Sequence, residues 1–298
     1  MTIKSVGKFL ISMISLVCLL TSCSLSTKYK VFEVGDYDYN SEAKHKMEIE
    51  YDTGSHKDQK LVNSKKTIEY NGVAYLCEYS KTIETGGYKG AYDQYFYESG
   101  NGIIVDFGIN CDTGKMVQYS WYDKDYLKFT KTPILNREEC LALAEDYLSG
   151  YTDNISQYKL EKEKLHKAND GLGDFYDFTF NRYIDGIKTN DRASIGITVR
   201  GTVFSHALHH FGQMNDAVVP TEKDISIIEK NIDEKMNKIY YKSGDAYNFS
   251  YKTTDRVLRR MQDGKYALEY TIDVDITPTD SSSHLKCTEL VSLIVYLE

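Results

Sequence analysis

Long stretches of this chain alternate apolar with polar residues, and this period of two restricts most of the chain to β-strands. One such stretch places five apolar residues on a single face: Ile103, Val105, Phe107, Ile109 and Cys111. A second does the same near the C-terminus: Leu268, Tyr270, Ile272, Val274 and Ile276. Turns that need positive φ follow at Asn101–Gly102, Asp185–Gly186 and Asp263–Gly264. The pattern predicts antiparallel strands joined by hairpins.

Two segments break this pattern with helical spacing. Asn136 is a good N-cap, Glu139 completes a capping box, and Gly150 ends the predicted helix over 137–149. The second helix is predicted over 222–240, after Pro220. Its apolar stripe repeats every three or four residues: Ile225, Ile228, Ile232, Met236 and Ile239.

Together these elements predict an α+β fold, built as successive units of one helix packed on an antiparallel sheet. We expect a mainly β domain over 46–132, an α+β unit over 133–215 and a second α+β unit over 216–298. The helix at 137–149 should pack on strands from about 175–210. The helix at 222–240 should pack on strands from about 247–298.

The N-terminus indicates export. Lys4 and Lys8 precede an apolar stretch, Phe9 to Leu20, that is shorter than the roughly 20 residues needed to span a bilayer. Leu20-Thr21-Ser22-Cys23 then resembles the lipobox of bacterial lipoproteins. The resemblance implies a signal peptide over 1–22, acylation of Cys23, for example by palmitate, and an anchor and polar tether over 23–45. The alternative is an ordinary signal peptide with a chance cysteine.

Charge narrows the range of partners. The formal net charge is −8, which argues against nucleic acid, because binding a phosphate backbone needs a basic footprint. The acidic composition also predicts that the surface has no basic patch to bind the anionic head groups of lipids. We therefore expect an extracytoplasmic protein held on the cell membrane through membrane lipid on Cys23. The 26 tyrosines favour a sheet-rich protein and could also suit a ligand surface.

The cysteines of the mature chain show no metal or redox motif. Cys77, Cys111, Cys140 and Cys287 are widely spaced, without a C-x-x-C pair. Export permits a disulfide between Cys77 and Cys111. Free core cysteines are the other interpretation, and we favour it.

One stretch resembles a known group. The pattern is Phe178-x-Phe180-x-Arg182-Tyr183-x-x-Gly186-Ile187, followed by Asp191, Ile197 and Gly201. It is similar to the PepSY-like repeats of YcdB/YcdC-type exported proteins, best over residues 133 to 212, with a weaker copy at 92 to 122. The resemblance implies a helix on a small antiparallel sheet and a binding or inhibitory role outside the cell, often restraint of proteases. It implies no catalytic residues.

Few residues suggest chemistry. His206-Ala207-Leu208-His209-His210 resembles the inverted zinc-protease motif H-x-x-E-H, but His209 stands where the catalytic Glu belongs. On a strand, His206 and His210 would share a face and could hold a metal with a third ligand. Arg182, beside Tyr183, could recognise an acidic group or simply stack on neighbouring tyrosines.

We therefore expect a non-enzymatic binding or regulatory module, with a protein partner at the cell surface, no metal and no cofactor. Its candidate binding residues are Arg182 and Tyr183. The alternative is an extracytoplasmic metal-binding protein or hydrolase that uses His206, His209 and His210.

Overall fold

The computed structural model describes residues 29–34, 52–85, 90–168, 171–210, 212–241, 247–261, 264–279 and 287–297. The predicted signal peptide 1–22 and Cys23 lie outside these residues. None of the helices within the described ranges is both long enough and apolar enough to cross a bilayer.

Strands make up most of the described chain. The first seven are β1 (Val31–Val34), β2 (Asp52–His56), β3 (Lys65–Tyr70), β4 (Val73–Thr85), β5 (Gly90–Glu98), β6 (Ile103–Asn110) and β7 (Met116–Asp123). The others are β8 (Tyr158–His166), β9 (Phe175–Ile184), β10 (Ile187–Thr198), β11 (Val203–His209), β12 (Tyr247–Arg260), β13 (Tyr266–Pro278) and β14 (Cys287–Leu297). The helices are α3 (Tyr126–Phe129), α4 (Arg137–Ser149), η1 (Ile155–Gln157) and α5 (Glu222–Tyr241).

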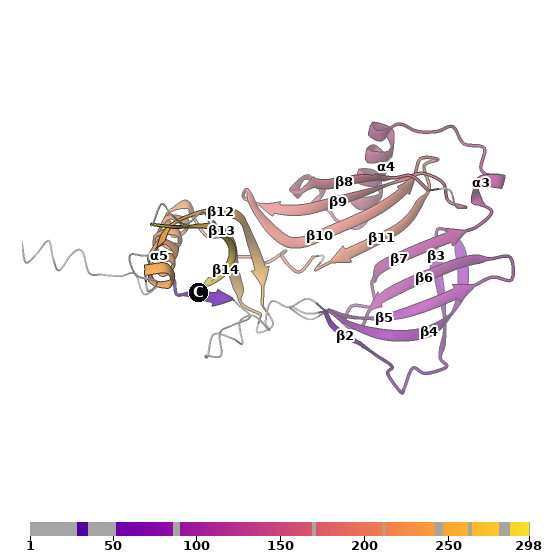
Figure 1. The fold of residues 1–298 in the computed structure, drawn as a ribbon. Coiled ribbons are helices and arrows are strands. Elements are labelled where there is room, and N and C mark those ends of the chain that lie inside the picture. The colour runs from indigo at the N-terminus through magenta and orange to yellow at the C-terminus, as the bar shows by residue number, and fades with distance from the viewer. Residues whose placement is uncertain are drawn as a thin grey trace, which may run out of the picture.

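The described strands form one 14-stranded sheet, whose main path runs β1-β14-β13-β12-β10-β11-β7-β6-β5-β4-β2. Strand β10 is the branch point, since it pairs with β9, β11 and β12. Its pairing with β12 is parallel and joins Lys188 to Val257 and Thr189 to Leu258. Figure 1 shows the result as three parts: β2–β7 at the lower right, β8–β11 with α4 above them, and β12–β14 with α5 at the left.

The expected fold class, successive units of one helix on an antiparallel sheet, is wrong. Hydrogen bonds of the sheet cross both expected unit boundaries, because β11 pairs with β7 and β10 pairs with β12. The described part of the molecule is one continuous, mostly antiparallel sheet, and the helices cover only parts of it. Alternation in the sequence predicts each strand but not which strands pair. The sequence therefore offers only the helices as a guide to where one unit ends and the next begins.

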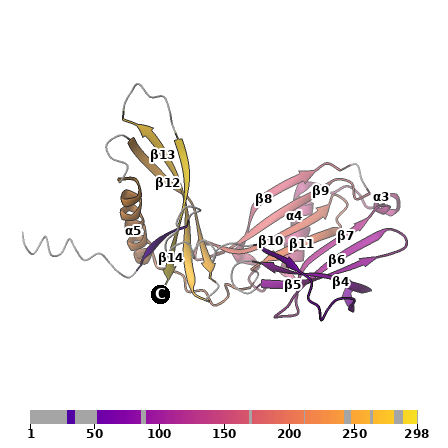
Figure 2. The ribbon, with the colours of Figure 1, turned by 60° about the horizontal axis from the view of Figure 1, so that its bottom comes forward.

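The two main helices nevertheless lie where their sequences predict. In α4, Asn136 accepts from the backbone of Glu139, whose side chain returns a bond to the backbone of Asn136. Helix α4 packs on β9 and β10 through Cys140, Ala144 and Leu148. Helix α5 buries Ile228, Ile232 and Met236 against the inner faces of β12, β13 and β14, an arrangement visible in Figure 2.

The N-terminal strand corrects a second expectation. Residues 23–45 were expected to be a polar tether, but β1 pairs antiparallel with β14 along Val31–Val34. Just before it, Tyr29 is buried, and its hydroxyl donates to Asp224 of α5 at 2.8 Å. The chain is therefore fixed to the last part of the sheet only six residues after Cys23.

Candidate functional site

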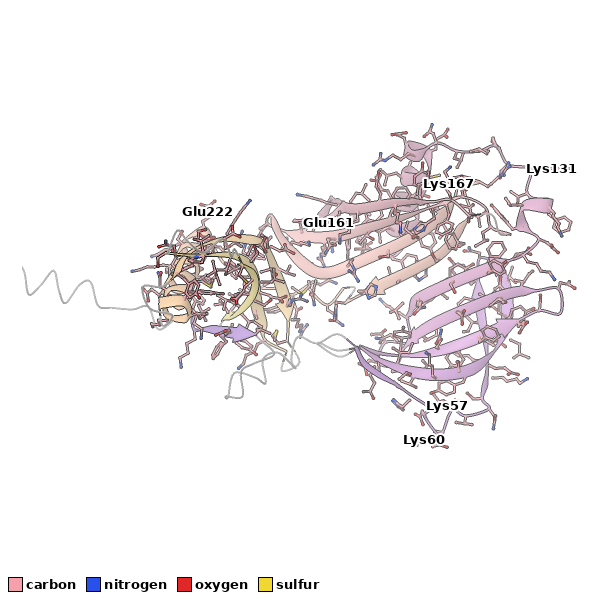
Figure 3. All side chains as sticks on the ribbon, viewed as in Figure 1. Lys57, Lys60, Lys131, Glu161, Lys167 and Glu222 are labelled. Atoms are coloured by element: carbon pink, nitrogen blue, oxygen red, sulfur yellow. The ribbon has the colours of Figure 1, made fainter. Side chains whose placement is uncertain are left out.

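A groove of about 620 Å³ lies where the central strands meet β12 and β13. Its walls come from β8, the β9–β10 hairpin, α5, β12 and β13. The lining residues, called the groove residues below, are Glu161, Lys162, Tyr183, Gly186, Ile187, Lys188, Glu229, Thr253, Thr254, Asp255, Arg256 and Tyr270. Glu161 is labelled in Figure 3 near the junction of the two parts. The parallel pairing of β10 with β12 holds the two walls together.

Tyr183, a candidate binding residue from the sequence, lies on the wall of this groove. Its hydroxyl donates a hydrogen bond to Glu161, and Lys159 Nζ lies 4.6 Å from the centre of its ring. Burial and the Glu161 carboxylate raise the pKa of Tyr183 to about 12. The bond from Tyr183, assisted by Lys188, lowers the pKa of Glu161. At neutral pH the pair is therefore a neutral phenol donating to a carboxylate.

Opposite charges are paired across the groove. Lys188 Nζ lies 3.5 Å from Glu161 and 3.4 Å from Asp255, so it links β8, β10 and β12. On the facing wall, Arg256 lies 3.4 Å from Glu229 of α5. Among the lining residues three cationic side chains balance three carboxylates. Such a surface does not select for net charge; it offers donors and acceptors to a polar chain.

Tyr270 adds an unusual feature to the groove. The residue is 1% exposed, and its hydroxyl makes no hydrogen bond of standard geometry among the described residues, although Arg256 lies close enough to act on its pKa. A buried hydroxyl with so little hydrogen bonding is uncommon. Burial also raises the pKa of Tyr270 to about 12, so the hydroxyl stays protonated. The described lining contains no His, Cys or Ser.

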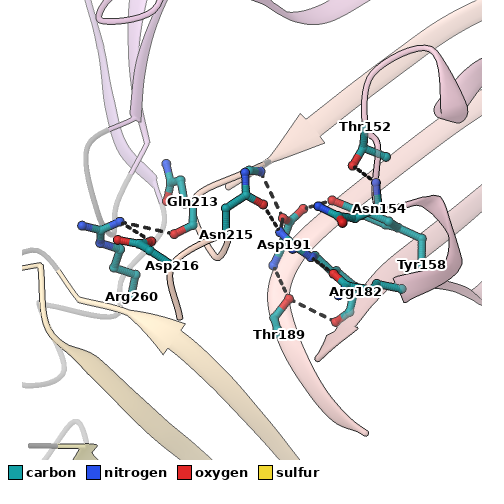
Figure 4. Close-up of polar contacts among 12 residues, drawn as sticks. Thr152, Asn154, Tyr158, Arg182, Thr189, Asp191, Gln213, Asn215, Asp216 and Arg260 are labelled. Carbon is teal, nitrogen blue, oxygen red and sulfur yellow. Dashed lines mark hydrogen bonds and ion pairs between the residues drawn. The ribbon is translucent and has the colours of Figure 1, made fainter. Parts of the chain in front are cut away.

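Arg182, the other candidate, points to the opposite face of β9, as the alternation of a strand requires. It is 3% exposed, and its Nη1 lies 3.4 Å from Asp191 Oδ2. Nε donates to Gln157 and Nη1 donates to Asn215, at 2.8 and 2.6 Å. Figure 4 shows this network. Nε and Nη1 are thus engaged inside the protein, and this burial argues against recognition of an external acidic group by Arg182.

Asp191 is as fully enclosed as its partner. Its carboxylate accepts hydrogen bonds from Tyr158 Oη at 2.8 Å and from the Gly212 amide at 3.0 Å. Burial raises the pKa of Asp191 to about 6, against the lowering effect of Tyr158, Gly212 and Arg182. The carboxylate is thus ionised at neutral pH only because of its partners.

The segment 212–216 connects this network to the last part of the sheet. Gly212 and Asn215 bond to Asp191 and Arg182 on one side. On the other side, Asp216 accepts from Arg260 at 3.2 Å and from Tyr266 at 2.6 Å. Hydrogen bonds thus hold the segment to both parts of the sheet. Arg182 and Asp191 are therefore positioning residues.

The three histidines do not form the expected cluster. Strand β11 ends at His209, and His210 follows with a φ of 54° and its ring 3.3 Å from Gln213. His206 and His210 therefore do not share a strand face. His209 is exposed, whereas His206 is 2% exposed. Among the described residues no group of three or more His, Cys, Asp and Glu side chains is placed to hold a metal ion.

His206 lies instead in a buried cluster of tyrosines. Its Nδ1 is 2.6 Å from Tyr147 Oη, which also bonds to Tyr70 at 2.6 Å and Tyr151 at 3.0 Å. These side chains come from β11, α4 and β3, so the cluster joins the first part of the sheet to the second. Burial lowers the pKa of His206 to about 4, and Nε2 has no partner among the described residues.

Most groove residues gave no signal in the sequence. Glu161, Lys188 and Asp255 lie on three strands far apart in the chain, and each is an ordinary polar position of its own strand. The sequence does predict Tyr183, because it stands beside Arg182 in the pattern that resembles the repeat family. The regular alternation around Tyr270 marks it as inward-facing, but it does not indicate a buried hydroxyl with so little hydrogen bonding.

Comparison with known proteins gives one match. The family model described as the YcdB, YcdC repeated domain matches residues 42–208, which include β2–β10 and nearly all of β11. No curated protein and no solved structure matches the chain. Since the match spans more than half of the chain, the protein belongs to the YcdB, YcdC repeated domain family.

Proposed function

We propose that the protein is a lipid-anchored, extracytoplasmic binding module that holds a segment of a protein partner in its groove. The observation that carries this proposal is the groove itself. Its walls bring paired charges from β8, β10, β12 and α5 to one surface, with Tyr270 buried beside them. An extended peptide brings alternating amide donors and carbonyl acceptors, which suit such a lining. The groove is a contact surface rather than a reaction centre in this proposal.

The location and the kind of partner come from the sequence. Leu20-Thr21-Ser22-Cys23 resembles a lipobox and follows an apolar stretch, so we propose that acylated Cys23 holds the protein on the cell membrane. The PepSY-like character of the repeat around Arg182 and Tyr183 is part of the same proposal. Because that resemblance implies restraint of proteases, an exported protease is the first partner to test.

Site-specific photocrosslinking in intact cells tests the groove. A photoreactive residue at Lys162, an exposed groove residue, should capture a partner. The matched position is Lys164, which is also exposed and lies two residues further on the same face of β8 but outside the groove. Capture at Lys162 and not at Lys164 is the expected result.

A blocking variant makes the test specific. Thr254→Trp would fill the groove from an exposed position, whereas Lys252→Trp places the same ring on β12 outside it. We expect Thr254→Trp to abolish the crosslink, together with any inhibition of the captured protease, and Lys252→Trp to preserve both. Equal capture at Lys162 and Lys164, or capture that survives Thr254→Trp, would refute the groove as the binding site.

A further inference from the structure

The far end of the molecule carries an apolar tip. Four of the eleven exposed large apolar side chains among the described residues fall in the short stretch from Leu127 to Leu143. Phe129 is 77% exposed and Ile134 is 68% exposed. We define the α3 tip as Leu127, Lys128, Phe129, Lys131 and Ile134. Isolated exposed apolar residues are ordinary, but a group of them marks a contact surface.

The backbone beneath the tip is held firmly. The Leu127 amide donates to Gly171 O at 3.2 Å, and the Leu135 amide donates to Val199 O at 2.8 Å. Just before the first of these points, Tyr126 is buried, and its hydroxyl lies 2.8 Å from Thr202 Oγ1. The chain is therefore anchored on both sides of the tip, and its exposed side chains are presented outward from a fixed base.

Cations surround the apolar side chains. Lys124 and Lys131 are exposed and have no carboxylate partner among the described residues. Lys128 pairs with Asp125 at 2.6 Å, and Arg200 donates to the carbonyl of Thr132. This gathering is notable in a chain with a net charge of −8. The overall composition predicted no basic patch for anionic lipid heads, but it averages over the surface and conceals a local cluster.

The tip is also convex. Figures 1 and 2 both show α3 at the end of the molecule opposite β14, and Figure 3 labels Lys131 at the same end. An acidic protein partner would need a concave, complementary surface around such a projection. A fluid bilayer needs none, since apolar side chains enter the acyl boundary while lysines remain at the phosphates.

We propose that the α3 tip inserts into the surface of an anionic phospholipid bilayer. Phe129, Ile134 and Leu127 supply the apolar contact, and Lys124, Lys128 and Lys131 supply attraction to lipid phosphates. This inference rests on the tip alone and is independent of the groove. If Cys23 is acylated as proposed, the α3 tip adds a second attachment to the membrane.

A tryptophan reporter tests insertion in the full chain. The chain has one tryptophan, so Phe129→Trp combined with Trp121→Phe places a single indole on the tip. Vesicles of phosphatidylglycerol and phosphatidylcholine with brominated acyl chains should quench this indole and shift its emission to the blue. Vesicles of brominated phosphatidylcholine alone should do neither. The effect should weaken as salt is added.

Matched variants separate the tip from other membrane contacts. Leu290→Trp in the same Trp121→Phe background places the indole on β14 at a position that is 68% exposed, against 77% for Phe129. We expect no quenching there, and loss of quenching at Phe129→Trp when Lys128 and Lys131 are both changed to Glu. Flotation of the unlabelled parent beside that double variant repeats the comparison without altering Trp121.

Three outcomes would overturn the proposal. They are quenching of equal size at both reporter positions, equal quenching by neutral vesicles, and no quenching with either lipid. The last result would show that the tip does not enter either bilayer.

Discussion

The guanidinium of Arg182 on β9 lies 3.4 Å from the carboxylate of Asp191 on β10, and both side chains are at most 4% exposed. The pair closes a network that reaches Gln157 on one side and Asn215 on the other. Because Asn215 belongs to the segment that leads to α5, the ion pair connects the middle of the sheet to its last part.

Breaking this pair from one side should be costly. Arg182→Met leaves the Asp191 carboxylate buried without a cation, and we expect a loss of about 3–5 kcal/mol in the free energy of unfolding. Urea denaturation measures it. The double variant Arg182→Met/Asp191→Leu removes both charges and should recover part of that loss. Two strictly additive losses would show that the residues do not act as a pair.

The buried histidine predicts a pH dependence with a definite sign. The folded pKa of His206 is lowered to about 4, whereas an unfolded histidine titrates near 6.5. As the pH falls below about 6.5, the histidine binds a proton in the unfolded state but stays neutral in the folded state. Stability should therefore fall by roughly 3 kcal/mol between about pH 6.5 and pH 4 through this group alone.

A difference profile isolates this contribution. His206→Phe keeps an aromatic ring among Tyr119, Tyr147 and Tyr151 and removes the titration. Asp191 opposes His206, because its raised pKa of about 6 makes the folded state gain stability as acid is added. We therefore expect the loss of stability in acid to be smaller in His206→Phe than in the parent, and larger in Asp191→Asn. Parallel profiles for the parent and His206→Phe would contradict the assignment.

Gly171 supports the α3 tip by close approach. A Cβ at this position would lie 2.4 Å from the carbonyl oxygen of Lys124, which is backbone and cannot swing away. Gly171→Ala should cost about 1–3 kcal/mol through overpacking, measured by thermal or urea unfolding. Gly100→Ala is the matched control, since a Cβ there meets nothing within 4 Å. Equal stability of the two variants would show that the tip moves freely away from its base.

Local features of the fold could be predicted from the sequence because their causes are local. The Asn136 capping box is confirmed by the bond from the Glu139 amide at 3.0 Å. The positive-φ turns are confirmed at Gly102, Asp185 and Gly186, with φ values of 86°, 48° and 80°. Such features depend on a few neighbouring residues, so the sequence contains the whole explanation.

The partners of the strands could not be predicted in the same way. Each face of β10 alternates like any other strand, and nothing in it indicates that Lys188 will pair with Val257 of β12. The groove could not be predicted for the same reason, because Glu161, Lys188 and Asp255 meet only through that pairing. For Arg182 and Tyr183, alternation predicts opposite faces, but only the tertiary structure decides which face receives Asp191 and which opens to the groove.

The packing of α5 gives a direct test of the core. Ile232 is 3% exposed among residues of β12–β14, so Ile232→Asp would bury a charge without a partner and should cost several kcal/mol, about 3 or more. The matched change is Asn237→Asp, which adds the same charge at an exposed position of the same helix. It should alter stability by less than about 1 kcal/mol. Denaturant midpoints that fall equally would place Ile232 at the surface.

The four described cysteines should react in a fixed order. All are free thiols; Cys77 and Cys140 are buried, whereas Cys111 and Cys287 are exposed. Burial and the neighbouring Asp93 raise the pKa of Cys111 to about 11, and the thiolate is the reactive form. With peptide mapping after pulses of iodoacetamide at neutral pH, Cys287 should be labelled first and Cys111 more slowly. Cys77 and Cys140 should be labelled only when denaturant is present. A disulfide between Cys77 and Cys111 would instead protect both until a reductant is added, and Ala substitution at Cys77 would then free Cys111 for labelling.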